Sequence, residues 1–264
     1  MNILEKIVIH KKKEVAERKS LYPVSLLEKS IYFQTPVVSL KKYLTRPDKL
    51  GVIAEFKRKS PSKPSINLYA EVEKVSIGYM QAGASALSVL TDHDFFGGSL
   101  ADLTEARKFN FCPILRKDFI IDEYQLLEAK SAGADAILLI AECLEKASLK
   151  KLAATAHDLG LEVLMEIHDE TGLEKLNEHI DVLGVNNRDL RVFKTDIQNS
   201  INLATQIPVG QIKISESGIR TPEDIVRLLA AGFDGFLIGE QFMKNADPGK
   251  ACNELIHQVQ LQKK

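Results

Sequence analysis

The sequence contains little of what marks a metal site, a disulfide-bonded scaffold or a membrane protein. Its three cysteines, Cys112, Cys143 and Cys252, are odd in number and far apart, with no CxxC or Cys/His cluster around them. The six histidines show no HxxH or HExxH spacing. The longest apolar runs, such as residues 136–141, are far too short to span a bilayer. We therefore expect reduced cysteines, no metal and a cytoplasmic protein.

The sequence also lacks an excess of charge of either sign. Its 35 Lys and Arg residues balance its 36 Asp and Glu residues, and the two signs are interspersed along the chain. A surface that binds nucleic acid or an anionic membrane needs clustered basic residues. We expect neither partner, and a small molecule is the expected ligand.

A repeated pattern organises most of the chain: an Ala-Gly pair closes a helix, and a short apolar strand follows at once. About eight strands are expected, which is the number that a (β/α)₈ barrel needs. They lie within residues 51–57, 81–91, 113–119, 131–141, 157–167, 177–187, 211–218 and 230–240. Helical patterns fill the gaps, at residues 70–81, 100–109, 123–132, 145–159, 171–178, 197–206, 221–231 and after residue 247.

This alternation fits two α/β architectures, an open doubly wound sheet and a closed barrel. We favour the barrel because no strand is followed by GxGxxG or GxxxxGK[ST], and because nearly every strand ends in polar residues. Residues 1–50 lie outside the alternation, and residues 3–19 have the pattern of an amphipathic helix. The predicted fold is a single (β/α)₈ TIM barrel domain over residues 1–264, with residues 1–50 as a helical extension.

Ionisable side chains gather at the predicted carboxyl ends of the strands, where the active site of such a barrel forms. Glu55 and Lys57 lie two residues apart on one strand and therefore share a face. Other strand ends supply Lys117, Glu166, Asn186 and Glu216. A single charged residue of this kind is more often a solvated loop residue. Several on successive strands indicate a catalytic cluster, in which one carboxyl group can stay protonated beside an ionised one.

Two glycines follow the last two predicted strands, Gly218 in SESGI and Gly239 in LIGE. Barrels often bind phosphate there through backbone N–H groups, and glycine lets the backbone approach the anion closely. Ser60 and Ser62 could add contacts from the loop after the first strand. In that loop Arg58, Lys59 and Lys63 are predicted to be exposed basic residues. His168 is interpreted as a loop residue and not as a metal ligand.

These segments together resemble the indole-3-glycerol-phosphate synthase family of tryptophan biosynthesis, over nearly the entire chain. The motifs that carry the resemblance are AEFKRKSPS (54–62), SVLTDHDFFGGS (88–99), LRKDFI (115–120), MEIHDE (165–170), GVNNRDL (184–190), SESGI (215–219) and FLIGEQFM (236–243). The resemblance implies a barrel whose N-terminal extension covers the catalytic face. It also implies ring closure of 1-(2-carboxyphenylamino)-1-deoxyribulose 5-phosphate to indole-3-glycerol phosphate, with loss of carbon dioxide and water and with no cofactor.

The resemblance also implies roles for the catalytic cluster. Lys117 would be the general acid that protonates the ketone oxygen, and Glu166 would serve the proton transfers of the later dehydration. Glu55 would orient and charge-balance the lysines. Lys57 would lie by the substrate carboxylate or act in dehydration. Asn186 and Glu216 would hold the sugar hydroxyls and the lysines.

For the substrate, the resemblance implies two binding regions. Arg188, Phe96 and Phe119 would receive the anthranilate end. The phosphate-binding positions match Ser60, Ser217, Gly218, Gly239 and Glu240, mostly through the backbone. We expect a phosphorylated small-molecule substrate and a monomer, with contact to other tryptophan-pathway enzymes left open.

Two alternatives remain open at this point. Another phosphosugar barrel enzyme, such as phosphoribosylanthranilate isomerase, would share the glycines after the last two strands, but it would not explain both lysines together with NNRD. A non-catalytic barrel that binds a phosphorylated ligand would have no need of Lys117 and Glu166.

Overall fold

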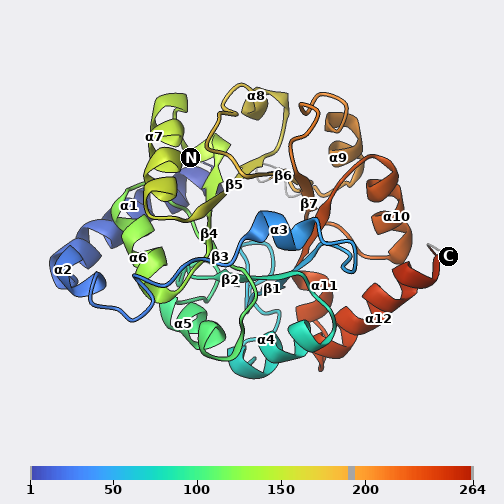
Figure 1. Ribbon diagram of the computed structural model, residues 1–264, viewed down its shortest axis with the longest axis horizontal. Helices are drawn as coiled ribbons and strands as arrows, with labels where there is room; N and C mark the ends of the chain where they lie inside the picture. The colour runs from blue at the N-terminus through green and yellow to red at the C-terminus, as the bar shows by residue number, and fades with distance from the viewer. Residues whose placement is uncertain (1, 190–193, 263–264) are drawn as a thin grey trace.

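The computed structural model describes residues 2–189 and 194–262. Its eight parallel strands close into a barrel in sequence order, so the predicted TIM barrel is confirmed (Figure 1). The strands are β1 (Val52–Phe56), β2 (Ala86–Leu90), β3 (Ile114–Lys117), β4 (Ala136–Ile140), β5 (Glu162–Ile167), β6 (Val182–Asn186), β7 (Lys213–Glu216) and β8 (Gly235–Ile238). Each of the eight lies within a segment that the sequence predicts.

Helices surround the barrel and extend it at the N-terminus. Before β1 lie α1 (Ile3–Leu21), α2 (Val24–Leu27) and α3 (Leu40–Leu44). The later helices are α4 (Val72–Gln81), α5 (Leu100–Phe109), α6 (Tyr124–Ala132), the 3₁₀ helix η1 (Ala141–Cys143), α7 (Lys146–Asp158), α8 (Glu170–Leu173), α9 (Gln198–Leu203), α10 (Pro222–Ala230), α11 (Glu240–Met243) and α12 (Pro248–Gln262). None of the helices in the described ranges is long and apolar enough to cross a membrane.

The glycines that close helices behave as the repeated pattern predicts. Gly83, Gly133, Gly160 and Gly232 follow α4, α6, α7 and α10, and each has a positive φ, between 75° and 94°. This left-handed conformation ends a helix at little cost only when the residue is glycine. The chain then turns directly into the next strand.

Two helices are shorter than their sequence patterns predict. The pattern at 171–178 gives only the short α8, which contains Gly172, a poor helix former. A β-carbon at that glycine would lie 2.6 Å from the Ile167 side chain, so packing excludes a better helix former. The pattern at 197–206 gives a helix that ends at Leu203.

The core has two layers. Inside the barrel, Ile53, Leu115, Leu138, Leu164 and Ile214 pack together, while a larger cluster lies between the outer faces of the strands and the helices. The short helix α3, which the sequence pattern did not reveal, adds Leu40 and Leu44 to the inner cluster. Since Ser39 contacts Glu162 at the start of β5, α3 closes the amino end of the barrel and leaves the carboxyl end for a site.

Helix α1 lies at the opposite, carboxyl end. Ile3 and Ile7 from its first two turns line the cavity there, and Ile7 is buried. Lys11 of α1 is fully buried and pairs with Asp92 and Asp118, which follow β2 and β3.

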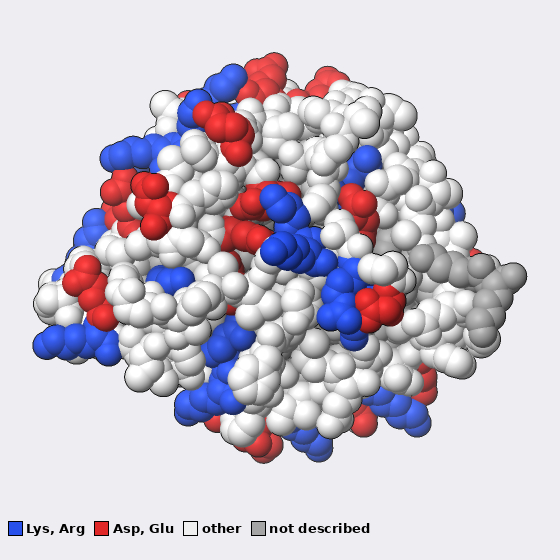
Figure 2. All heavy atoms as spheres, in the orientation of Figure 1, with Lys and Arg blue, Asp and Glu red and all other residues white. Residues whose placement is uncertain are grey.

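On the face shown in Figure 2, basic and acidic side chains are interspersed, as the balanced composition predicts.

Candidate active site

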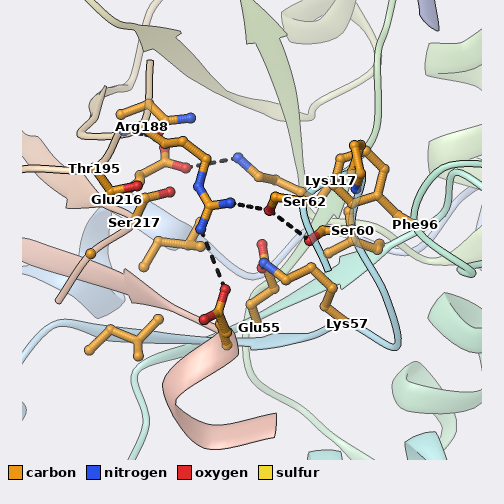
Figure 3. Close-up of a pocket in the computed structure, with 18 of the residues that line it drawn as sticks. Glu55, Lys57, Ser60, Ser62, Phe96, Lys117, Arg188, Thr195, Glu216 and Ser217 are labelled. Atoms are coloured by element: carbon orange, nitrogen blue, oxygen red, sulfur yellow. Dashed lines mark hydrogen bonds and ion pairs between the residues drawn. The ribbon is translucent and has the colours of Figure 1, made fainter. Parts of the chain in front are cut away.

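A cavity of about 430 Å³ opens at the carboxyl ends of the barrel strands. This volume lies in the range typical of small-molecule sites. Every site residue that the sequence predicts lines this one cavity: Glu55, Lys57, Ser60, Phe96, Lys117, Phe119, Glu166, Asn186, Arg188, Glu216, Ser217, Gly218, Gly239 and Glu240. Figure 3 labels ten of the lining residues, which come from strands and loops on several sides of the barrel.

Lys117 lies at the centre of an ion-pair cluster. Its ammonium nitrogen Nζ is 2.6 Å from Oε2 of Glu166 and 2.8 Å from Oε2 of Glu216. Asn186 donates a hydrogen bond of 2.9 Å from Nδ2 to the other oxygen of Glu166. Lys117 on β3 is thus held between Glu166 on β5 and Glu216 on β7, whose side chains are almost fully buried.

A second pair lies beside this cluster. Lys57 directly follows β1, and its Nζ is 2.6 Å from Oε1 of Glu55, so the two side chains lie on one side, as their two-residue spacing predicts. A β-carbon at Gly239 would lie 2.5 Å from the same Glu55 oxygen. Glycine at 239 is therefore required by the place of Glu55 itself.

The buried charges shift one another's pKa values. Burial would lower the pKa of Lys117, but the surrounding carboxylates, Glu166 first, raise it above its ordinary value. Burial likewise opposes ionisation of Glu166, yet Lys117 and the Asn186 hydrogen bond hold its pKa below the ordinary value. The cluster therefore contains a charged lysine beside an ionised glutamate at neutral pH.

Glu216 behaves differently from Glu166. Burial raises the pKa of the Glu216 carboxyl group. The nearby Lys117 acts to lower this pKa, whereas the Glu166 carboxylate raises it further. Its Oε1 atom is buried and has no hydrogen-bond partner within the described residues. One lysine cannot neutralise two carboxylates, so Glu216 tends to hold a proton while Glu166 stays ionised. This is the division between two acids that the sequence pattern predicts.

The chain between β7 and α10 has an unusual backbone. Ser217 is the only non-glycine residue in the described ranges with a positive φ, 67°, and Gly218 follows with 74°. Strained backbone of this kind is concentrated at functional sites. Both residues line the cavity together with Gly239, so amide groups from the ends of β7 and β8 border the same space.

Two aromatic rings border another part of the cavity. Phe96 and Phe119 lie with their ring centroids 5.9 Å apart and follow β2 and β3. Their rings offer an apolar surface on which a planar aromatic group can pack. Among the described residues, no group of three or more His, Cys, Asp or Glu side chains is arranged to hold a metal ion.

Sequence comparisons with known proteins find a matching family and several relatives. The sequence model of the family described as indole-3-glycerol phosphate synthase matches residues 4–255. Proteins named indole-3-glycerol phosphate synthase from Bacteroides thetaiotaomicron and Magnetococcus marinus are 49% and 43% identical to this chain. The alignments cover 98% and 97% of the chain, and 99% and 98% of the two relatives.

The chain belongs to the indole-3-glycerol phosphate synthase family.

Solved structures add support for the fold alone. The 3-hexulose-6-phosphate synthase of Salmonella typhimurium superposes with a TM-score of 0.62 at 14% identity, covering 81% of this chain and all of that one. The tryptophan synthase alpha subunit of Legionella pneumophila superposes with a TM-score of 0.59 at 16% identity, covering 84% and 97%. At such low identity these structures confirm the barrel and say nothing of the reaction.

The family resemblance assigns Arg188, with Phe96 and Phe119, to the anthranilate end, and all three residues line the cavity. The Arg188 side chain contacts the Ser62 hydroxyl and the Glu240 carboxylate, at 3.4 Å for the latter (Figure 3). Arg188 therefore joins the loop after β1 to the start of α11.

The prediction that the basic residues after β1 form an exposed loop holds for Lys63, whose side chain is 53% exposed, and is wrong for Arg58. The Arg58 side chain is only 22% exposed and makes a bidentate ion pair with Asp102 on α5. Lys63 lines the cavity, and its Nζ lies 2.5 Å from Oε1 of Glu240. No local sequence pattern marks Lys63, which comes directly after the AEFKRKSPS motif (54–62). His168 is a loop residue, as predicted, and its Nδ1 contacts the Asn186 carbonyl.

Proposed function

We propose that this chain is an indole-3-glycerol phosphate synthase, a carbon-carbon lyase that closes 1-(2-carboxyphenylamino)-1-deoxyribulose 5-phosphate to indole-3-glycerol phosphate. The family membership supports the reaction. The observation that carries it to this site is Lys117 Nζ, held 2.6 Å from Glu166 and 2.8 Å from Glu216 inside the cavity. Electrophilic activation of a ketone needs such a positioned cation with a proton to give.

Lys117 acts first. Its ammonium group donates a proton to the ketone oxygen while the ring carbon that bears the carboxylate attacks the ketone carbon. A carbon–carbon bond forms, and the ketone becomes a hydroxyl group. The raised pKa of Lys117 ensures that the proton is present at neutral pH before the substrate binds.

Loss of carbon dioxide follows. The bond between the ring and the carboxylate breaks, and its electron pair restores the aromatic ring. This step needs no external base and no electron sink, so the residues of the cavity suffice for it.

Dehydration completes the indole. The new hydroxyl group leaves as water after it receives a proton, and the carbon next to the nitrogen loses a proton to a base. Glu166 is the proposed base, since it is ionised, buried and hydrogen-bonded by Asn186. Lys57 is the proposed acid for the departing hydroxyl or the partner of the substrate carboxylate, and Glu55 balances its charge.

The two ends of the substrate are proposed to bind in different parts of the cavity. The phosphate is proposed to lie against the backbone of Ser217, Gly218 and Gly239, with Ser60 nearby. The anthranilate ring is proposed to pack on Phe96 and Phe119. We further propose a cytoplasmic, monomeric, cofactor-free enzyme that works as one barrel domain with residues 1–50 as its extension.

A turnover assay tests this proposal. Purified protein mixed with the synthetic substrate should produce the fluorescence of the indole product, and the phosphate-free analogue should react far more slowly. Absence of product from the phosphorylated substrate would refute the proposed activity. That result would support a non-catalytic barrel that binds a phosphorylated ligand, an alternative that the family match does not favour.

A further inference from the structure

A carboxylate, that of Glu240, lies beside the proposed phosphate-binding residues, although a negative charge there disfavours phosphate binding. Glu240 follows Gly239 at the end of β8, and both residues line the cavity beside Ser217 and Gly218. Burial opposes its ionisation, but Lys63, Arg188 and Lys57 hold the pKa of Glu240 below its ordinary value. It is therefore ionised at neutral pH, and alone it would repel an anion.

The neighbours of Glu240 explain how a negative group can stay there. Lys63 Nζ lies 2.5 Å from its Oε1, and Arg188 NH2 lies 3.4 Å from its Oε2. Arg188 also contacts the hydroxyl of Ser62, two residues after Ser60 (Figure 3). The Glu240 carboxylate thus pairs with two cations from different loops, Lys63 after β1 and Arg188 after β6.

This group is the most open of the ion pairs in the cavity. The side chains of Lys63 and Glu240 are 53% and 28% exposed, whereas those of Lys117 and Glu166 are 14% and 5% exposed. An exposed pair contributes little free energy, because water solvates its charges almost as well when they are apart. The pairs of Glu240 are consequently the ones that an incoming anion can replace most easily.

We propose that Glu240 is a stand-in anion, and that Lys63 is a further substrate-binding residue. The Glu240 carboxylate neutralises Lys63 and Arg188 when no substrate is bound. The substrate phosphate, which carries more negative charge than a carboxylate, takes the two cations from Glu240 when it enters. This inference rests on the proposed synthase activity for its ligand.

The opposite role of Glu240 makes the opposite prediction. If Glu240 served only to hold Lys63 and Arg188 in place for the substrate, removing its charge would loosen both cations and weaken binding. If Glu240 competes with the phosphate, removing its charge frees both cations and strengthens binding. The direction of the change in affinity therefore separates the two roles.

The test uses the full-length enzyme with Glu240→Gln, Lys63→Met and the double variant. Glu240→Gln should lower KM, and it should lower the inhibition constant of inorganic phosphate about two- to fivefold, which is the range for exposed ion pairs. Lys63→Met should raise both constants with kcat little changed. In the double variant the gain from Glu240→Gln should shrink, because one of the two freed cations is missing.

Two variants control for the change in net charge. Lys59→Met removes a cation from the same loop, where Lys59 contacts the carbonyl of Asp94. Glu178→Gln removes an exposed carboxylate paired with Lys150, far along the chain from this loop. Neither should change KM or the phosphate inhibition constant.

Anthranilate serves as a second probe, since it carries the carboxylate and the ring without the phosphate. The proposal predicts that Glu240→Gln changes its inhibition constant less than that of phosphate. A higher KM and weaker phosphate inhibition for Glu240→Gln would overturn the proposal, and so would a gain confined to anthranilate. Calorimetric titration with inorganic phosphate gives the same comparison without turnover, so a failure of the synthase assay is distinguishable from a failure of this inference.

Discussion

Replacing Lys11 by methionine should test how the N-terminal helix is fixed over the barrel. The Lys11 side chain is fully buried, and its Nζ lies 2.8 Å from Asp92, 3.0 Å from Asp118 and 2.8 Å from Glu14. The side chains of Asp92 and Asp118 are at most 1% exposed. Methionine keeps the length of the lysine but leaves these two buried carboxylates without this cation.

The cost of that change follows from burial. Removing one partner of a buried ion pair typically lowers the free energy of unfolding by about 3–5 kcal/mol, because the remaining charge is left without compensation. A domain is stable by only about 5–15 kcal/mol. Lys11→Met should therefore lose a large part of the stability, measured by urea unfolding at pH 7.

The neighbouring Lys12 supplies the matched control. It lies on the same helix and is exposed, so Lys12→Met should change the free energy of unfolding by less than about 0.5 kcal/mol. The double variant Lys11→Met/Asp92→Asn should recover part of the loss, since it removes one of the uncompensated charges. A loss below about 1 kcal/mol for Lys11→Met would refute the reasoning.

The loss should also depend on pH in a defined direction. Burial would raise the pKa of Asp118, but Lys11 and then Arg116 hold it well below its ordinary value. Such a carboxylate contributes stability above its unfolded pKa of about 3.9, and the contribution disappears as the pH falls through the folded pKa. The difference between wild type and Lys11→Met should be full at pH 7 and shrink below about pH 4.

The remaining predictions concern the catalytic cluster. Lys117→Ala should lower kcat by about 10²–10⁴-fold with an unchanged circular dichroism spectrum, and a near-normal kcat would remove it from the mechanism. Glu166→Gln should lower kcat more than it raises KM, since the amide cannot exchange a proton; equal activity would exclude the carboxylate. Glu55 helps to raise the pKa of Lys117, so Glu55→Gln should move the alkaline limb of the pH–rate profile to lower pH, and an unmoved limb would contradict the coupling. Dialysis against a strong chelator should leave activity unchanged, whereas a loss restored by a divalent ion would overturn the cofactor-free reaction.

Local sequence patterns were sufficient to predict the barrel and the side chains at its mouth. Strand and helix periodicity act over a few residues, and the glycines that end helices adopt their left-handed backbone wherever the chain must turn. Because parallel strands in a barrel all end at the same face, Glu55, Lys117, Glu166 and Glu216 had to meet once the strands were placed. Their assembly in one cavity follows from their place on the strands.

Only the tertiary structure decided which charges pair with which. Lys63 and Glu240 are 177 positions apart, and Lys11 reaches Asp92 and Asp118 from a helix outside the barrel repeat. No local pattern distinguishes Lys63, which lines the cavity, from its neighbour Lys59. The pairing depends on the closing of the barrel, which brings the loops after β1, β6 and β8 together and takes some of their charges out of water.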